Sequence, residues 1–374
     1  MNQMNWPAIY PELVLLACAL VVAMVDLWVE HPRRLPTYLL TQASLAVVAV
    51  MHLLAFNAGD TVYAMQRMVV ADPMGHLLGL FSTLAVMITL VYARPYAAER
   101  DILKGELFTL SMFSLLGIGV MLSANNFLVV YLGLELMTLS LYALTAMRRD
   151  HADSTEAAMK YFVLGALASG FLLYGLSMMY GATGSLGIPE VYKAIGTGQP
   201  NQGVMILAVV FIVAGLGFKL GAVPFHMWVP DVYQGAPTAV TLLIGAAPKL
   251  AAFAITIRLL VEGMIGRAAD WQQMLVVLAV GSMLLGNVVA IAQSNLKRML
   301  AYSSIAQMGF MLLGLCSGVV YNNTLSAANS YASSMFYIVT YVLTTLGSFG
   351  MIMLLSRQGF EAEEIDDLKG LAKR

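Results

Sequence analysis

The 374-residue chain is 60% hydrophobic and only 11% charged, with a mean hydropathy of +0.79. Soluble domains carry about 25% charged residues, so this chain has too few to cover a surface that faces water. The formal net charge is −1, which gives no sign of the basic surface that binds nucleic acid. Composition therefore predicts an integral membrane protein embedded in a lipid bilayer, with no nucleic-acid partner.

Eleven stretches are apolar enough to cross a hydrocarbon core, which takes about 20 residues. In chain order they are 11–29, 37–56, 74–93, 107–123, 126–146, 160–180, 204–228, 238–261, 273–293, 300–319 and 332–356. The first lacks a basic segment before it and a small-residue cleavage site after it, so it is expected to remain as a span. The longest loop, 181–203, is expected to contain a short helix around Pro189–Ile195. We therefore predict an all-α polytopic membrane protein with a single transmembrane helical domain, 1–374.

Basic residues are distributed unequally between the two sides of the predicted bundle. Loops after odd-numbered spans, together with the tail after span eleven, hold fourteen Lys and Arg, whereas the other loops and flanks hold four. Those four are Arg67, Lys193, Arg258 and Arg267. Because Lys and Arg are enriched in cytoplasmic loops, the N-terminus is predicted to lie outside and residue 374 in the cytoplasm.

Three ionisable residues are predicted to lie deep inside spans: Glu135, Lys219 and Lys249. A charge at the bilayer centre costs roughly 2.5–3.5 kcal/mol on insertion scales, so such residues are candidates for a functional site. Burial disfavours the charged form of a lysine, whereas a nearby carboxylate favours that form. Moving the carboxylate or admitting water to the site can therefore make the lysine bind or release a proton. The three residues are therefore predicted to form a proton relay.

The surroundings of these residues are suited to charge. Glu135 shares a helical face with a polar stripe made of Tyr131, Thr138, Tyr142 and Thr145. Pro248 weakens the helix beside Lys249, because proline cannot donate to the carbonyl four residues earlier. Lys219 lies in a glycine-rich segment that Pro224 interrupts, and broken helices recur at ion sites in transporters.

Two further residues near the predicted helix ends are ambiguous. His226 follows the segment of Lys219 and is a candidate relay residue, because histidine titrates near neutral pH; the alternative is a hydrogen-bonded residue at the interface. Lys297 begins span ten and is expected to be a topology anchor or an interface residue. A structural ion pair between helices remains the alternative for the intramembrane charges as well.

Four segments resemble the proton-pumping module shared by the antiporter-like subunits of complex I and by multisubunit cation/proton antiporters. They are FLVVYLGLELMTLSLYAL, GLGFKLGAVPFHMWVPDVYQGAPT, APKLAAFAI and QSNLKRMLAYSSIAQMGF. The closing stretch LLSRQGFEAEEIDDLKGLAKR is similar to the N-subunit branch of proton-translocating NADH:quinone oxidoreductase. By this resemblance, Glu135 corresponds to the family's span-five glutamate, Lys219 to the lysine on its broken helix and Lys249 to its central span-eight lysine.

The resemblance covers essentially the whole chain and implies an architecture and a function. The implied fold has N-terminal helices (1–106), a first five-helix repeat (107–261) and an inverted second repeat with a cytoplasmic tail (273–374). Family members continue through several more spans, so the second repeat is expected to be truncated and the chain to be a fragment, unless other helices complete it. The implied function is proton translocation in the bacterial inner membrane.

The resemblance also implies the partners and the cofactors. Redox chemistry belongs to other subunits of complex I, which bind NAD, FMN, iron–sulfur clusters and quinone, whereas this chain is expected to bind no cofactor and no metal and to have no redox or hydrolytic active site. Two alternatives stay open. One is a subunit of a multisubunit cation/proton antiporter, and the other is a passive assembly subunit if the truncated chain is the mature form.

Overall fold

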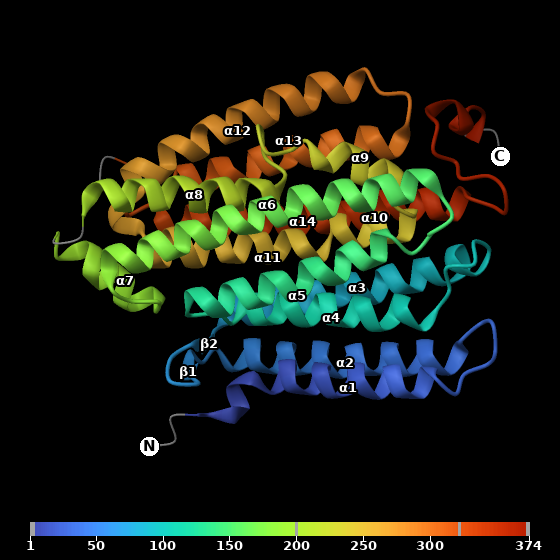
Figure 1. Cartoon of the computed structure of the whole chain (residues 1–374), viewed down its shortest axis with the longest axis horizontal. Helices are drawn as coiled ribbons and strands as arrows, with labels where there is room; N and C mark the ends of the chain where they lie inside the picture. The colour runs from blue at the N-terminus through green and yellow to red at the C-terminus, as the bar shows by residue number, and fades with distance from the viewer. Residues whose placement is uncertain (1–3, 199–200, 321–322, 372–374) are drawn as a thin grey trace.

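The computed structural model describes residues 4–198, 201–320 and 323–371. Within these ranges eleven helices are long and apolar enough to cross a membrane. They run side by side along the long axis of the molecule, with α1 and α2 at one side of the bundle and α12 at the other (Figure 1). Each of the eleven predicted spans corresponds to one of these helices, which confirms the all-α membrane fold.

The helices follow one another with short connections. Their bounds are α1 (Tyr10–Asp26), α2 (Leu35–Ala58), α3 (Pro73–Ala98), α4 (Gly105–Leu122), α5 (Phe127–Thr145), α6 (Ala152–Thr183), α7 (Ile188–Gly196), α8 (Gln202–Leu220), α9 (Trp228–Gly235), α10 (Thr238–Gly245), α11 (Ala247–Thr256), α12 (Ala268–Ile291), α13 (Leu296–Cys316) and α14 (Ala327–Leu355). A π-helical segment, Ile257–Gly263, continues α11. The short helix predicted in the longest loop is confirmed as α7.

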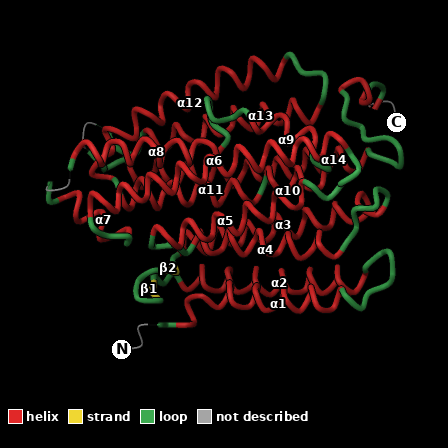
Figure 2. The backbone as a smooth tube through the Cα atoms, viewed as in Figure 1, coloured by secondary structure: helices red, strands yellow, loops and turns green. Residues whose placement is uncertain are grey.

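One element of the described chain is not helical. Strands β1 (Val62–Ala64) and β2 (Val69–Ala71) pair antiparallel, with Val62 opposite Ala71. The hairpin joins α2 to α3 at the end of the bundle that carries the N-terminus (Figure 2). The sequence analysis did not predict it, because its two strands are too short to show an alternating pattern.

Two predicted spans are interrupted. The span predicted at 204–228 ends at Leu220, because Gly221 adopts a left-handed conformation (φ 78°) and the chain restarts as α9 only at Trp228. The span predicted at 238–261 changes direction at Ala246, whose φ and ψ are −106° and −96°. The second break precedes Pro248, which has no N–H to continue the helical hydrogen bonds.

The broken span formed by α10, α11 and the π-helical segment lies at the centre of the bundle. All residues of its apolar window are buried, and α11 packs against α3, α4, α8 and α14. By contrast, α12 presents an apolar row to the outside, where Val277, Leu284 and Ile291 are 69%, 65% and 87% exposed. A helix buried on every side is enclosed by protein, so the segment that carries Lys249 is shielded from lipid.

Candidate functional site

The C-terminus of α8 lies inside the bundle, where its carbonyl groups need partners. A helix leaves its last four C=O groups without intrahelical donors. The left-handed turn at Gly221 provides donors for two of these carbonyls. The N–H of Gly221 donates to the carbonyl of Phe218 at 3.0 Å, and the N–H of Ala222 donates to the carbonyl of Gly217 at 2.8 Å. Two carbonyl groups, those of Lys219 and Leu220, remain for a donor from another helix.

Lys249 supplies that donor from the first turn of α11. Its ammonium group donates to the carbonyl of Leu220 at 2.7 Å and to that of Lys219 at 3.5 Å, and it lies 5.4 Å from the centre of the Trp228 ring. Lys249 is only 1% exposed, and no carboxylate forms an ion pair with it in the described parts of the chain. The charge is therefore offset by helix-terminal carbonyl dipoles, an arrangement worth up to about 2 kcal/mol when partly buried.

Lys219 lies at the last turn of α8, and its side chain points to a different neighbour. Its ammonium group donates to the hydroxyl of Ser169, on α6, at 3.1 Å. Glu135 lies on α5, which packs against α6, the helix of Ser169. In the ranges described, Glu135 and Lys219 form no ion pair, and Glu135 Oε1 is buried without a hydrogen-bond partner.

His226 lies in the segment between α8 and α9. Its Nδ1 is buried without a partner, and the structure records no hydrogen bond from its side chain to Lys219 or Lys249 among the described residues. The two lysines are instead joined directly, because the ammonium group of Lys249 contacts the carbonyl of Lys219. The arrangement brings the two lysines together and leaves His226 outside their hydrogen bonds.

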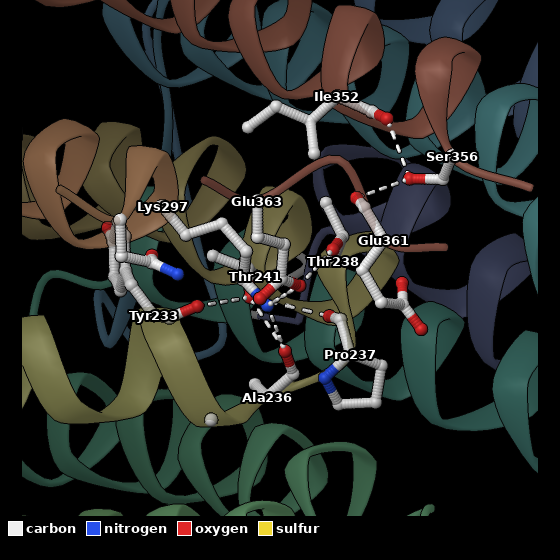
Figure 3. A network of polar contacts seen from close by, with 12 residues as sticks. Tyr233, Ala236, Pro237, Thr238, Thr241, Lys297, Ile352, Ser356, Glu361 and Glu363 are labelled. Carbon is white, nitrogen blue, oxygen red and sulfur yellow. Dashed lines mark hydrogen bonds and ion pairs between the residues drawn. The ribbon is translucent and has the colours of Figure 1, made fainter. Parts of the chain in front are cut away.

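Lys297, at the start of α13, is a buried charge that the sequence analysis placed at an anchor or interface. It is 2% exposed and donates to the carbonyl of Ala236 at 2.7 Å and to Glu363 Oε1 at 2.9 Å (Figure 3). A topology anchor faces water, so that part of the expectation is wrong. The acidic tail EAEE in the sequence was the available signal for its partner.

Arg258, counted among the loop and flank residues in the sequence analysis, is also buried, with 1% exposure. Its guanidinium group donates to Asp72 at 2.7 and 3.0 Å, to Glu262 at 3.0 Å and to the carbonyl of Leu122 at 2.8 Å. Removing one partner of a buried ion pair typically costs about 3–5 kcal/mol, so this cluster fixes the far end of the broken span against α3 and α4.

The side chains that could bind a metal ion are dispersed over the described parts of the chain. Within residues 4–198, 201–320 and 323–371, no group of three or more His, Cys, Asp or Glu is placed to hold a metal ion. The two cysteines, Cys18 and Cys316, are both free and lie on different helices, α1 and α13.

Known proteins resemble this chain over its full length. The family model described as "NADH:quinone oxidoreductase/Mrp antiporter, TM" matches residues 124–374. The NADH-quinone oxidoreductase subunit N of Polaromonas naphthalenivorans is 63% identical over 374 residues, which are 100% of this chain and 75% of that protein. The chain belongs to the NADH-quinone oxidoreductase subunit N family. It spans about three quarters of the length of this relative, whose sequence is longer.

Solved structures agree with the subunit N assignment. A chain of respiratory complex I from Thermus thermophilus with bound aureothin superposes with a TM-score of 0.79 at 30% identity, over 97% of this chain and 74% of that one. A chain of the Mrp complex from Dietzia superposes equally well, at 0.79, but at 19% identity over 95% of this chain and 64% of that one. The second likeness shows the fold alone, which the subunit N family shares with antiporter subunits.

Proposed function

We propose that this chain translocates protons across the bacterial inner membrane as a subunit of respiratory complex I. Membership of the subunit N family supports this, and so does the buried constellation of Glu135, Lys219 and Lys249. One observation carries the proposal: the Lys249 ammonium group donates to the carbonyls that end α8, the helix that carries Lys219. Two broken helices with buried lysines therefore meet at one hydrogen-bonded junction.

The junction offers a way to control where the proton is. The charge on Lys249 is stabilised by the C-terminal carbonyls of α8, and the charge on Lys219 by Ser169 and by the nearby Glu135. The junction couples the two sites, because a shift in the end of α8 alters both the carbonyls that hold Lys249 and the place of Lys219. Movement of the end of α8 or of Glu135 then changes which of the two lysines binds the proton more favourably. Driving energy comes from redox chemistry in partner subunits, where NAD, FMN, iron–sulfur clusters and quinone bind.

The proposed orientation places the N-terminus outside and the C-terminal segment in the cytoplasm. It rests on the fourteen-to-four distribution of Lys and Arg over the two sides. The proposed repeats, 107–261 and 273–374 after the N-terminal helices 1–106, are supported by family membership and by the two helix breaks in the first of them.

A cation/proton antiporter subunit is the second candidate, because the matching family model covers both groups of proteins. A dependence of transport on sodium distinguishes it from a subunit that pumps protons alone. A passive assembly role predicts that charge-removing substitutions affect only the amount of assembled complex.

Lys249 provides the test of the relay. In the complete complex reconstituted in vesicles, Lys249→Arg keeps the charge but holds its proton at any accessible pH, because arginine does not titrate. We expect normal subunit abundance and a loss of proton pumping per electron on the order of ten-fold or more. Lys193→Arg, at an exposed position on α7, is the matched control. Normal pumping in Lys249→Arg, with Lys249→Ala failing only through lost assembly, would show a structural ion instead.

A further inference from the structure

A polar cavity of about 300 Å³ lies at the end of the bundle where the C-terminal segment packs. Residues of α6, α9, α13 and the segment after α14 line it. Asp231, on α9, links α6 and α13 in one wall of the cavity, since it accepts hydrogen bonds from Lys160 and Arg298 at 2.7 Å each. A volume of this size and polarity accommodates several water molecules. The cavity therefore brings water to the bundle end at which Glu363 also lies.

Glu363 connects this cavity to the buried interior. It lines the cavity, and its Oε1 accepts from the Lys297 ammonium group at 2.9 Å and from the Thr238 hydroxyl at 3.5 Å (Figure 3). Lys297 itself does not line the cavity and is 2% exposed. Among the residues that line this cavity, Glu363 is the one that contacts the buried lysine behind the wall.

Polar groups continue inward from Lys297 to the helix break beside Lys249. The carbonyl of Ala236, which accepts from Lys297, also accepts from the Thr241 hydroxyl at 3.3 Å. Tyr233 is completely buried, and its hydroxyl oxygen has no hydrogen-bond partner within the described ranges. It lies against Gly245, where an added Cβ would be 3.2 Å from it. The hydroxyls of Ser304 and Tyr341, which bond to each other at 2.7 Å, adjoin it.

We propose that Glu363 and Lys297 form the uptake site at which protons enter the chain from this cavity. The proposal rests on the proton-translocating function above and identifies the place where protons enter the protein. A hydronium ion in the cavity gives a proton to Glu363 Oε1: one of its O–H bonds breaks, an O–H bond forms on the carboxylate, and neutral water remains. Lys297 passes one of its N–H protons to a water molecule on the inward side, which carries it on as hydronium toward Thr241 and Tyr233, and the resulting amine takes the proton from Glu363. Each proton that leaves inward is replaced from the cavity, so the site returns to its starting charge.

The position of Glu363 does not depend on its ion pair with Lys297. The segment Ser356–Leu368, which we call the strap, is anchored on both sides of Glu363 by other contacts. Glu361 accepts from Arg100 at 3.0 Å, and the N–H of Leu296 donates to the Glu363 carbonyl at 2.6 Å. Between Glu361 and Glu363, the backbone of Ala362 is held at φ 51°, a conformation that residues other than glycine and asparagine rarely adopt. Independent anchoring favours a functional carboxylate over a structural ion pair.

The test uses the complete complex in vesicles and compares three variants. Glu363→Gln keeps the shape but cannot carry a proton, and we expect turnover and pumping to fall about ten-fold, with partial recovery when formate supplies a small acid to the cavity. The double variant Lys297→Met with Glu363→Gln leaves no unpaired charge, so it should assemble normally and still pump slowly. Glu364→Gln, at the adjacent exposed position, is the control and should pump normally.

The results distinguish a failure of the uptake site from a failure of the relay that involves Lys249. Normal pumping in Glu363→Gln, or restored pumping in the double variant, overturns the uptake site and leaves a structural ion pair. A block in Lys249→Arg alongside normal pumping in Glu363→Gln means that the relay stands and its entrance is elsewhere. Absence of formate recovery in an assembled Glu363→Gln complex also contradicts proton uptake by this carboxylate.

Discussion

The Lys249 ammonium group lies 2.7 Å from the carbonyl oxygen of Leu220, the last residue of the helix that carries Lys219. A cation at this position is stabilised by the aligned peptide dipoles of α8 only while the end of that helix keeps its present place. The left-handed turn at Gly221 is what ends α8 there. The conformation of one glycine thus determines the electrostatic environment of a lysine 28 positions later.

Gly221→Ala should therefore disturb the junction. At φ 78° an alanine is strained by roughly 1–2 kcal/mol, and its Cβ would also lie 2.7 Å from Val229 Cγ2. We expect a lower melting temperature of the complex and slower pumping, because the carbonyls that hold Lys249 are displaced. Gly170→Ala on α6 is the matched control, since nothing lies within 4 Å of its added Cβ. Equal behaviour of the two variants would contradict the role of this turn.

Topology is tested by labelling of introduced cysteines. Asn57→Cys at the end of α2 and Gln358→Cys in the strap are both exposed positions. They are made in a background with Cys18 and Cys316 replaced by alanine. With an impermeant thiol reagent, intact cells should label Asn57→Cys only, and inside-out vesicles Gln358→Cys only. Labelling of both from the outside would rule out the proposed orientation.

The strap should detach only in acid. Burial alone would raise the pKa of Glu361, but hydrogen bonds from Arg100 and Tyr96 and the charge of Arg148 hold this pKa below the ordinary value of 4.5. A depressed folded-state pKa means that the contribution to stability is present above pH 4.5 and is lost as the pH falls through the lower, folded value. The protection factors of amides 357–368, corrected for the intrinsic pH dependence of exchange, should be unchanged from pH 8 to 5 and fall below pH 4.5. In Glu361→Gln it should be fast throughout, and a slow rate there would contradict the anchoring role.

Much of this structure was accessible from the sequence because lipid imposes strong patterns. An apolar run of about 20 residues has few alternatives to a spanning helix, so the eleven spans were predicted correctly. The same rule made Glu135, Lys219 and Lys249 conspicuous, because charge is rare inside such runs.

Other parts of the site depend on contacts between distant segments. Lys297 looked like an anchor because it stands beside Arg298 at a span edge, and only the folded strap provides its partner, 66 residues later. Arg258 was counted as a loop and flank residue because Asp72, which neutralises it, is 186 positions away. The link between Lys249 and α8 runs through backbone carbonyls, which no pattern of side chains reveals.

Glu135 is the remaining test of the relay, because the proposed relay gives it an electrostatic rather than a structural role. Its Oε1 is buried without a hydrogen-bond partner, so Glu135→Gln removes the charge and disrupts no ion pair recorded in the described residues. We expect assembly to remain normal, while pumping per electron falls by about ten-fold, because only the Ser169 hydroxyl then favours the protonated form of Lys219.

Glu135→Asp keeps the charge but shortens the side chain, so the loss of pumping should be smaller than in Glu135→Gln. Which variant pumps faster therefore distinguishes a role of the charge from a role in packing. Glu106→Gln, in the exposed first turn of α4, is the matched control for removing one carboxylate from this subunit. A packing role predicts the reverse order, because glutamine preserves the volume of the side chain and aspartate does not. Pumping by Glu135→Gln equal to that of Glu106→Gln would therefore remove Glu135 from the relay and leave the two lysines without their carboxylate.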